Sequence, residues 1–272
     1  MSTATAQFTF KRYEIKYLLE EDRYQALRRA LGDRITEDAY GLTDICNIYY
    51  DTPDFRLIRD SMDKPMYKEK LRLRSYGAAG EDTRVFAELK KKYDGVVYKR
   101  RVALPCAEAE AILPVEGGAV APGFVSHETA GEEDGQRQIF REIGSFLRYY
   151  GTLRPAMYLS YKRIAAFGTE DPALRVTFDT DILWRTDNVT LQAAPAGRSV
   201  LEAGQHLMEI KVPGAFPLWL SEILTDLEIY PTSFSKYGRA YSMMRAQDCE
   251  RLGVILAGRV AAANAKRRVA VA

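Results

Sequence analysis

Several segments of this 272-residue sequence carry ionised side chains at every second position. In KLRLRSY, Lys70, Arg72 and Arg74 alternate with leucines, and in LMEIKV Glu209 and Lys211 alternate with apolar residues. Side chains two residues apart lie on the same face of a β-strand, so each segment predicts a strand with one ionised face. Arginine binds phosphate oxygens with its planar fork, and lysine supplies a mobile point charge. The spacing therefore indicates chemistry on phosphate groups.

The ionised face is strongly basic when all of these segments are combined. Its basic members are Arg12, Lys16, Lys70, Arg72, Arg74, Lys90, Lys99, Arg101, Arg163, Arg175 and Lys211. Its acidic members are Glu14, Glu88, Asp179 and Glu209. The whole chain has 39 basic and 37 acidic residues, so its positive charge is concentrated on one surface. This favours binding of a linear polyanion over the alternative, an open sheet with one solvated face.

Hard divalent cations take oxygen ligands from carboxylates and phosphates together. The few acids among the basic residues therefore predict a site for Mg²⁺ or Mn²⁺. For Lys70 and Lys92 the sequence leaves open whether they contact a ligand or are solvated charges at the rim of the site.

The elements that must position these residues are mainly strands. Alternation and β-branched or aromatic content predict strands at 8–17, 43–51, 66–76, 84–92, 95–104, 154–168, 173–184 and 206–212. Asp94-Gly95 is typical of a tight hairpin. We expect an α+β fold in which an eight-stranded antiparallel β-barrel encloses the ionised face and helices pack outside.

Helical periodicity is present at 20–31, 136–150, 216–228 and 235–250, with short helices expected after Pro53 and near 106–113. Asp51 is expected to cap the first of these short helices. The stretch 114–135 is rich in glycine, proline and acids and predicts a flexible loop insertion. We expect one domain over 8–245, followed by a helical and basic C-terminal tail at 246–272.

Composition excludes other classes of protein. The net charge of only +2 gives no indication of nucleic-acid binding. Two histidines and three separated cysteines cannot form a multi-histidine zinc site or a disulfide framework, which fits a cytoplasmic protein. We see neither a signal peptide nor a membrane span, and Lys266, Arg267 and Arg268 are compatible with peripheral contact with an anionic membrane.

The motifs together resemble the VTC domain, the catalytic core of the vacuolar transporter chaperone complex and its bacterial relatives. That domain belongs to the triphosphate tunnel metalloenzymes, or CYTH superfamily. The motifs that carry the resemblance are RYEIKY, YYDTPDF, KLRLRSYG, FAELKKK, YKRRVAL, RPAMYLSYKRIAAF, LRVTFDTDI, LMEIKV and TSFSKYGRAY. The resemblance implies an eight-stranded tunnel and metal-dependent transfer of the γ-phosphoryl group of ATP to inorganic polyphosphate, with release of ADP.

Site residues follow from matching these motifs. The residues expected to grip the reacting triphosphate are Arg72, Arg74, Lys90, Lys99, Arg163 and Arg175. The motif match also places Lys16, Tyr161, Ser235 and Lys236 on the rest of the substrate, and Arg12, Arg101 and Lys211 of the ionised face are expected to join them. Glu209 matches the metal-holding glutamate, and Glu14 and Glu88 are expected to assist it.

Two alternatives remain open at this point. One is a hydrolase of tripolyphosphate or nucleoside triphosphates with the same tunnel, and the other is a non-catalytic polyphosphate-binding module. The expected ligands are ATP, inorganic polyphosphate and Mn²⁺ or Mg²⁺. A separate membrane protein that removes the product is a further expected partner, because the membrane segments of the eukaryotic complex are not found among these motifs.

Overall fold

A computed structural model of the protein describes residues 13–94, 96–130 and 134–269, with side chains described up to residue 253. Ten strands form one sheet in which every paired neighbour is antiparallel. The strands are β1 (Tyr13–Glu20), β2 (Ile35–Glu37), β3 (Thr43–Asp51), β4 (Tyr67–Tyr76), β5 (Arg84–Tyr93), β6 (Val96–Pro105), β7 (Arg154–Gly168), β8 (Arg175–Arg185), β9 (Arg198–Ser199) and β10 (Gln205–Val212).

The eight long strands are those expected from alternation, and β2 and β9 are short additions that pair with β7 and β8. The first expected strand began at residue 8, but residues 8–12 lie outside the described part of the chain. The strand order along the sheet is β1-β10-β8-β7-β3-β4-β5-β6.

The expected closed barrel is not present as a hydrogen-bonded structure. In the described residues the order ends at β1 and β6, and no ladder joins these two strands. The sheet nevertheless curves strongly, because Glu14 of β1 and Lys90 of β5 approach within 3.8 Å although they lie in opposite halves of the order. An antiparallel sheet twists as it grows, and this twist brings its two ends together. The ionised face is therefore the concave, inner face of the sheet.

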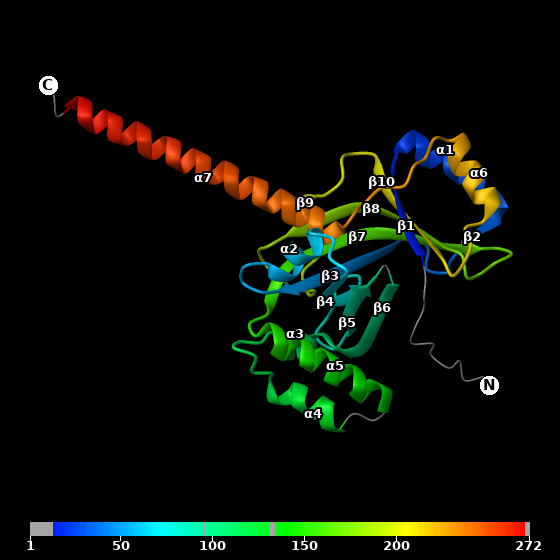
Figure 1. Ribbon diagram of the computed structural model, residues 1–272, viewed down its shortest axis with the longest axis horizontal. Coiled ribbons are helices and arrows are strands. Elements are labelled where there is room, and N and C mark those ends of the chain that lie inside the picture. The colour runs from blue at the N-terminus through cyan, green and yellow to red at the C-terminus, as the bar shows by residue number, and fades with distance from the viewer. Residues whose placement is uncertain (1–12, 95, 131–133, 270–272) are drawn as a thin grey trace.

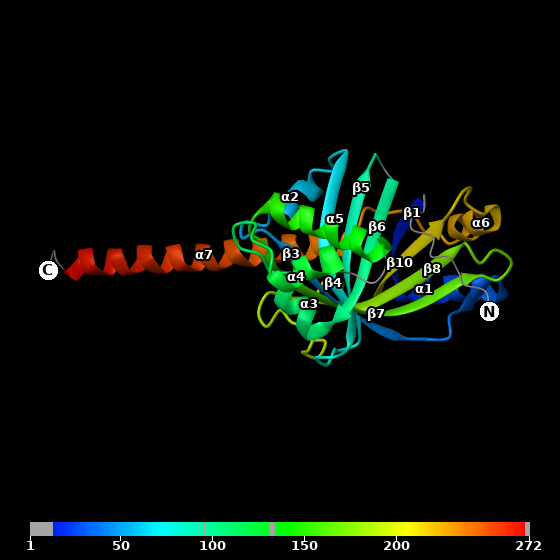
Figure 2. The same ribbon diagram turned by 90° about the horizontal axis from the view of Figure 1, so that it is seen from below.

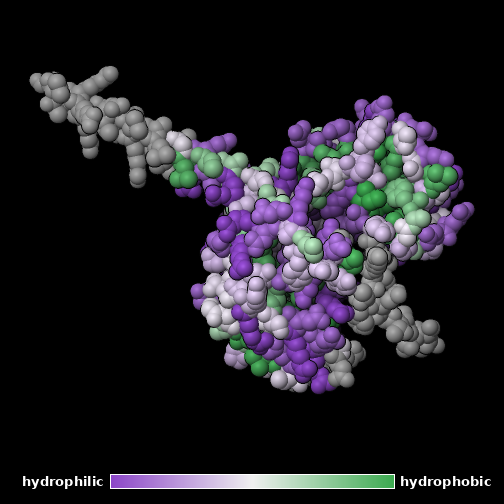
Figure 3. Space-filling model, in the orientation of Figure 1, coloured by the Kyte–Doolittle hydropathy of each residue, from purple (hydrophilic) through white to green (hydrophobic). Residues whose placement is uncertain are grey.

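The helices of the described residues are α1 (Glu21–Leu31), the one-turn η1 (Gly32–Arg34), α2 (Arg56–Met62), α3 (Cys106–Ile112), α4 (Pro122–Ala130), α5 (Asp134–Tyr150), α6 (Leu218–Asp226) and α7 (Lys236–Val269). Two groups of them cover the outer face of the sheet, whereas α7 begins on the inner side. Figure 1 shows α3, α4 and α5 beside β4, β5 and β6, whereas α1 and α6 lie at the opposite end of the sheet. The surface over α4 and α5 is largely hydrophilic on the face drawn in Figure 3, so these helices direct their apolar sides inward.

Apolar side chains on the outer face of the strands explain this arrangement. Leu71, Leu73, Val85, Ala87 and Leu89 are fully buried against the first group of helices. Burying a leucine or valine side chain contributes roughly 1.5–3 kcal/mol. The ionised inner face is thus held in position by an apolar outer face of the same strands.

The stretch 114–135 is not simply a loop, as the sequence had suggested. It contains α4, whose Phe124 is fully buried with its ring centroid 5.5 Å from that of Phe140 on α5. Glycine and proline obscured this helix in the sequence, but buried Phe124 and the ion pair between Glu128 and Arg148 attach it to α5.

Helix α7 begins in the interior and then leaves the domain. Tyr237 and Ala240 are buried in a third apolar cluster with Tyr49, Leu159 and Trp184 of the inner face. Figures 1 and 2 both show the rest of α7 as a straight helix that points away from α1 and α6. The helix continues without a break through residue 245, where the C-terminal tail was expected to begin. Among the described residues, no helix is long and apolar enough to cross a membrane.

Candidate functional site

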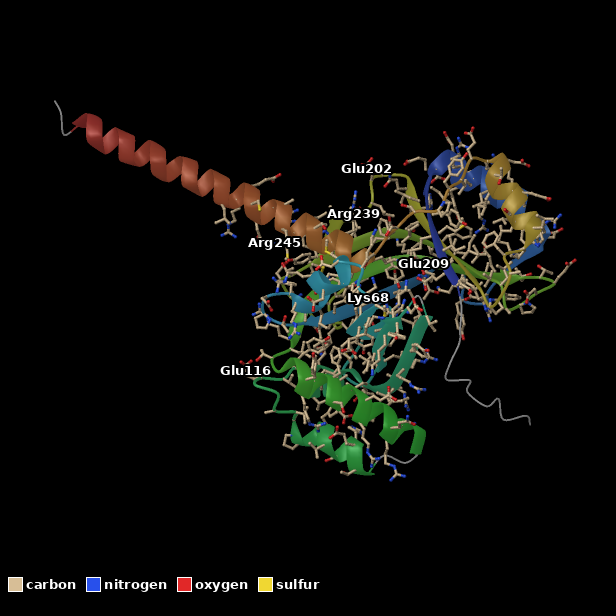
Figure 4. All side chains as sticks on the ribbon, in the orientation of Figure 1. Lys68, Glu116, Glu202, Glu209, Arg239 and Arg245 are labelled. Carbon is tan, nitrogen blue, oxygen red and sulfur yellow. The ribbon has the colours of Figure 1, made fainter. Side chains whose placement is uncertain are left out.

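Strand register brings the ionised residues into rows across the inner face. Lys16 of β1 lies opposite Glu209 of β10. In the other half of the sheet, Lys70, Lys90 and Lys99 form one row across β4, β5 and β6. Opposite residues of an antiparallel pair have Cβ atoms about 4.5–5.5 Å apart, so these charges interact directly. Figure 4 labels Glu209 and Lys68, which come from strands in the two halves of the sheet.

Glu88 is the acidic centre of the half formed by β4, β5 and β6. Its side chain is 1% exposed and forms ion pairs with Arg72 Nε at 2.6 Å and Lys99 Nζ at 2.5 Å. Burial opposes ionisation of Glu88, but Arg72, Arg74 and Lys99 outweigh it and lower its pKa. Glu88 is therefore a buried carboxylate that keeps two long basic side chains extended into the interior.

Arg74 is fixed by neutral oxygen atoms. Its Nε donates to Asn47 Oδ1 at 2.9 Å, and its Nη2 donates to the Tyr161 hydroxyl at 2.9 Å. The nearest oxygen of Glu88 is 4.0 Å from Nε. Hydrogen bonds to neutral partners orient the guanidinium but do not neutralise it, so Arg74 retains its charge for an anionic ligand.

A second acidic centre lies in the half formed by β7, β8 and β10. Asp179, which is fully buried, accepts from Arg163 Nε at 2.6 Å and Nη2 at 2.7 Å. Lys236 Nζ, from the first residue of α7, lies 2.6 Å from Asp179 and 3.0 Å from Glu209. Burial opposes the charge on Lys236, but these two carboxylates outweigh it and raise its pKa.

Glu209 is surrounded by cations. Besides Lys236, its carboxylate lies 3.2 Å from Lys211 Nζ and 3.5 Å from Lys16 Nζ. Lys16 is also 3.4 Å from Glu14. Burial raises the pKa of Glu209, and the surrounding cations more than reverse the effect, so its pKa lies well below the ordinary value. The same balance, with Lys90 as the main cation, lowers the pKa of Glu14 to about 2.

Three lysines of the β4–β5–β6 half are held in an unfavourable environment for a positive charge. Burial, together with Lys90 and other neighbouring cations, lowers the pKa of Lys70 to about 7. Burial lowers the pKa of Lys99 to about 8 and also lowers that of Lys90, although Glu88 and Glu14 respectively oppose the effect. A bound polyanion would reverse this penalty, because it supplies the missing negative charge.

The described interior contains nine basic side chains and four carboxylates. The basic residues are Lys16, Lys70, Arg72, Arg74, Lys90, Lys99, Arg163, Lys211 and Lys236, and the carboxylates are Glu14, Glu88, Asp179 and Glu209. The excess of positive charge is concentrated in a partly dehydrated space, where electrostatic interactions are stronger than in water. This arrangement can bind several phosphate groups in a row.

Two of the expected site residues lie outside the partly buried interior. Arg101 and Arg175 are exposed, and their guanidinium groups lie over the rings of Phe86 at 4.9 Å and Phe167 at 5.4 Å. Arg12 lies outside the described residues. Ser235 is close to the interior, where its Oγ accepts from the Gly238 backbone N–H at 3.2 Å and lies 3.5 Å from Lys70 Nζ.

The carboxylates do not form a ready-made metal cluster. No group of three or more His, Cys, Asp or Glu side chains in the described part of the chain has the arrangement of a metal site. Glu88 lies in a separate ion cluster from Glu209. Glu14 and Glu209 share Lys16, and Thr177, opposite Glu209 on β8, has a buried hydroxyl without a hydrogen-bond partner. Two carboxylates and a free hydroxyl fit an ion such as Mg²⁺ that takes its remaining ligands from phosphate and water.

Some residues of the site were not assigned from the sequence. Asp179 and Thr177 alternate with apolar residues on β8, and Asn47 and Tyr49 do so on β3, so a period of two was a signal for all four. Asp179 was recognised on the ionised face but received no role, because a sequence does not show which cation it contacts.

The chain was compared with curated protein sequences and with solved structures, and only the structures gave matches. No curated protein sequence matches the chain. Among solved structures, a candidate adenylate cyclase from Vibrio parahaemolyticus has a TM-score of 0.43 at 11% identity, covering 86% of this chain and 99% of that one. A candidate adenylyl cyclase from Hippeastrum, described as having a dominant triphosphatase activity, has a TM-score of 0.48 at 16% identity, covering 85% of this chain and 95% of that one.

The sequence model of one protein family covers all of the strands described above. The matched residues are 11–245, which include both acidic centres and the first turns of α7. This chain belongs to the VTC domain family.

Proposed function

We propose that this domain is a polyphosphate polymerase, which transfers the γ-phosphoryl group of ATP to inorganic polyphosphate and releases ADP. The observation that carries the proposal is the inner face of the sheet, on which nine basic side chains converge with only four carboxylates in the described residues. Membership of the VTC domain family supports a phosphate-rich ligand.

The curved sheet would act as a tunnel for a linear substrate. The contact between Glu14 and Lys90 supports closure of the tunnel by side chains rather than by a β1–β6 ladder. Phosphoryl transfer requires in-line alignment and stabilisation of charge on the transferred group, and it requires little covalent chemistry from the protein. A tunnel that holds donor and acceptor phosphates end to end meets both requirements.

The basic residues would divide this work according to their partners. Arg72, Arg74, Lys90 and Lys99 point into the interior from the β4–β5–β6 half and would grip the reacting triphosphate. Arg163 has two of its nitrogens occupied by Asp179, so we assign it a positioning role that keeps Tyr161 and the interior in place. Arg175 and Arg101 would act only at the tunnel rim, since both are exposed and, in the described residues, neither has an ion pair with an interior carboxylate. Lys99 is also partly exposed, but its pairing with buried Glu88 holds it at the interior.

Glu14 and Glu209, together with the Thr177 hydroxyl, would hold a divalent cation. When bound, the cation neutralises charge on the phosphate oxygens and orients them. Lys16 and Lys211 neutralise the same carboxylates in the structure, and they would shift to phosphate oxygens when substrate occupies the site.

The side chains of the interior favour transfer of the phosphoryl group to a phosphate acceptor over its transfer to water. A terminal phosphate of polyphosphate is already an anion and needs no strong base, whereas water must lose a proton. Neither histidine contacts the basic interior, because His127 pairs with Glu108 and His206 pairs with Glu21. An interior without a histidine base is thus better suited to the anionic acceptor.

The test is product analysis after incubation of the purified protein with ATP and Mn²⁺. A ladder of chains on a polyphosphate gel, with ADP formed in matching amount, is the expected result. Orthophosphate without a ladder would replace the proposal with a triphosphatase. Tight polyphosphate binding with no turnover in either Mn²⁺ or Mg²⁺ would replace it with a binding module.

A further inference from the structure

One group of lysines lies beside the basic interior and is not needed to hold a triphosphate. Lys68 on β4 and Lys92 on β5 lie directly opposite each other in the strand register. Lys64 lies in the turn before β4, and its charge acts on Lys68. We refer to Lys64, Lys68 and Lys92 as the outer lysine group.

The outer lysine group has no acidic partner. In the described part of the chain no carboxylate lies within ion-pair distance of any of the three, whereas Arg72, Lys99 and Lys211 each have one. Among the described residues, the one side-chain hydrogen bond of the group is from Lys68 Nζ to the Ser61 carbonyl at 3.2 Å. Like charges directly opposite each other in a sheet are destabilising, and Lys68 and Lys92 form such a pair.

The group continues the basic row of the interior. Lys68 and Lys70 are two residues apart on β4, as are Lys92 and Lys90 on β5, so all four side chains share the inner face. Successive residues on one strand face are about 7 Å apart.

We propose that the outer lysine group is an additional anion subsite, which binds phosphate groups of a long polyphosphate chain beyond those held in the interior. The inference rests on the proposed function and adds a determinant of chain length. Affinity for long chains then depends on the outer lysine group, and affinity for tripolyphosphate does not.

Four observations favour this role over that of ordinary solvated charges. The three lysines are adjacent, they lack carboxylates, two of them form a cross-strand pair of like charge, and the row leads into the proposed tunnel. Solvated lysines on a sheet surface are normally interspersed with acids, which reduces their repulsion. A linear chain of phosphates is the ligand class that fits charges repeated along a strand.

The test compares two ligands and two variants. K68A/K92A removes the cross-strand pair, and K91A removes the lysine next to Lys92, which lies on the opposite face of β5. Dissociation constants for tripolyphosphate and for long-chain polyphosphate are measured at several salt concentrations. Unfolding midpoints of all three proteins confirm that the variants are folded.

We expect K68A/K92A to weaken long-chain binding about tenfold. Its salt dependence should fall by about two counterions, because each lysine–phosphate contact that forms releases about one. Tripolyphosphate affinity stays within twofold, and K91A behaves as wild type. If K68A/K92A weakened the binding of both ligands equally, the proposal would be overturned, because the two lysines would then belong to the interior site. Unchanged long-chain affinity would overturn it as well.

Two further results distinguish failure of the proposed subsite from failure of the proposed function on which it rests. Wild-type protein that binds single-stranded DNA as tightly as polyphosphate of similar charge would identify a general polyanion patch and overturn the subsite alone. Wild-type protein that binds neither phosphate ligand would overturn the proposed function and the subsite together.

Discussion

Asp179 accepts hydrogen bonds from two nitrogens of Arg163, at 2.6 and 2.7 Å, and is itself fully buried. Arg163 was expected to grip phosphate, but a guanidinium held at two of its nitrogens has less capacity to bind a ligand. Lys236 Nζ lies 2.6 Å from the same carboxylate. One side chain of β8 therefore contacts both β7 and α7. Asp179 therefore connects the start of α7 to the sheet.

D179N is expected to destabilise the protein by about 3–5 kcal/mol, because removing one partner of a buried ion pair leaves the other charge uncompensated. Urea denaturation measures this change. D181N is the matched control, since Asp181 lies two residues further on the same strand and forms an exposed pair with Lys162. That variant should change stability by no more than about 1 kcal/mol. Equal effects of the two substitutions would contradict a structural role for Asp179.

Substitutions on the two faces of β5 should have different effects on the turnover number. Lys90 lies on the inner face, and Lys91 lies on the outer one. K90A is expected to lower kcat by roughly 100-fold, the size usual for loss of one group that stabilises developing charge. K91A should retain wild-type kcat. Steady-state ADP release measures both, and an active K90A would remove Lys90 from the catalytic set.

Glu209 is expected to influence metal and phosphate in opposite directions. E209Q removes a negative charge among Lys16, Lys211 and Lys236, so tripolyphosphate should bind more tightly without metal. The increase in affinity produced by Mn²⁺ should be lost. Calorimetry with and without Mn²⁺ measures both effects. E202Q, which changes an exposed glutamate in the loop before β10, is the control. Full Mn²⁺ enhancement in E209Q would show that Glu209 does not hold the cation.

Binding of ATP should take up protons near pH 8. The pKa values of Lys70 and Lys99 are about 7 and about 8 in the free protein, so both are partly neutral there. The ATP phosphates are already ionised, since a phosphate has its second pKa near about 6. Affinity should therefore fall between about pH 7 and 9, by at most about tenfold per pH unit for each coupled lysine. Apparent binding enthalpies in two buffers of different ionisation enthalpy give the number of protons taken up, and K70M should reduce it.

Stability of the ligand-free protein should change with pH in the opposite sense. An unfolded lysine has a pKa of about 10.4, so between about pH 7 and 10 the unfolded chain binds more protons than the folded one. The free energy of unfolding therefore rises with pH across this window. Thermal unfolding at several pH values tests the sign, and a fall in stability from pH 7 to 9 would contradict the environment assigned to Lys70.

Much of the inner face is determined by local covalent geometry. Alternation along a strand places Lys70, Arg72 and Arg74 on one face in any sheet, so the sequence alone identified a basic surface and the strands that carry it. The role of Asp51 was also local. It accepts from the backbone N–H groups of Leu57 and Ile58 at 2.8 and 3.1 Å, as expected for a carboxylate that precedes a short helix.

The partner of each charge was decided by the tertiary structure. Asp179 pairs with Arg163 because of the register between β7 and β8, which shifts at Ser160, and Lys236 reaches both strands only because α7 begins in the interior. The same carboxylate of Asp51 also accepts from Tyr237, which is 186 residues away. A period of two assigns a face to each side chain but carries no information on strand register or curvature. Those depend on contacts between distant segments, and they determine which basic residues are neutralised and which remain for a polyanion.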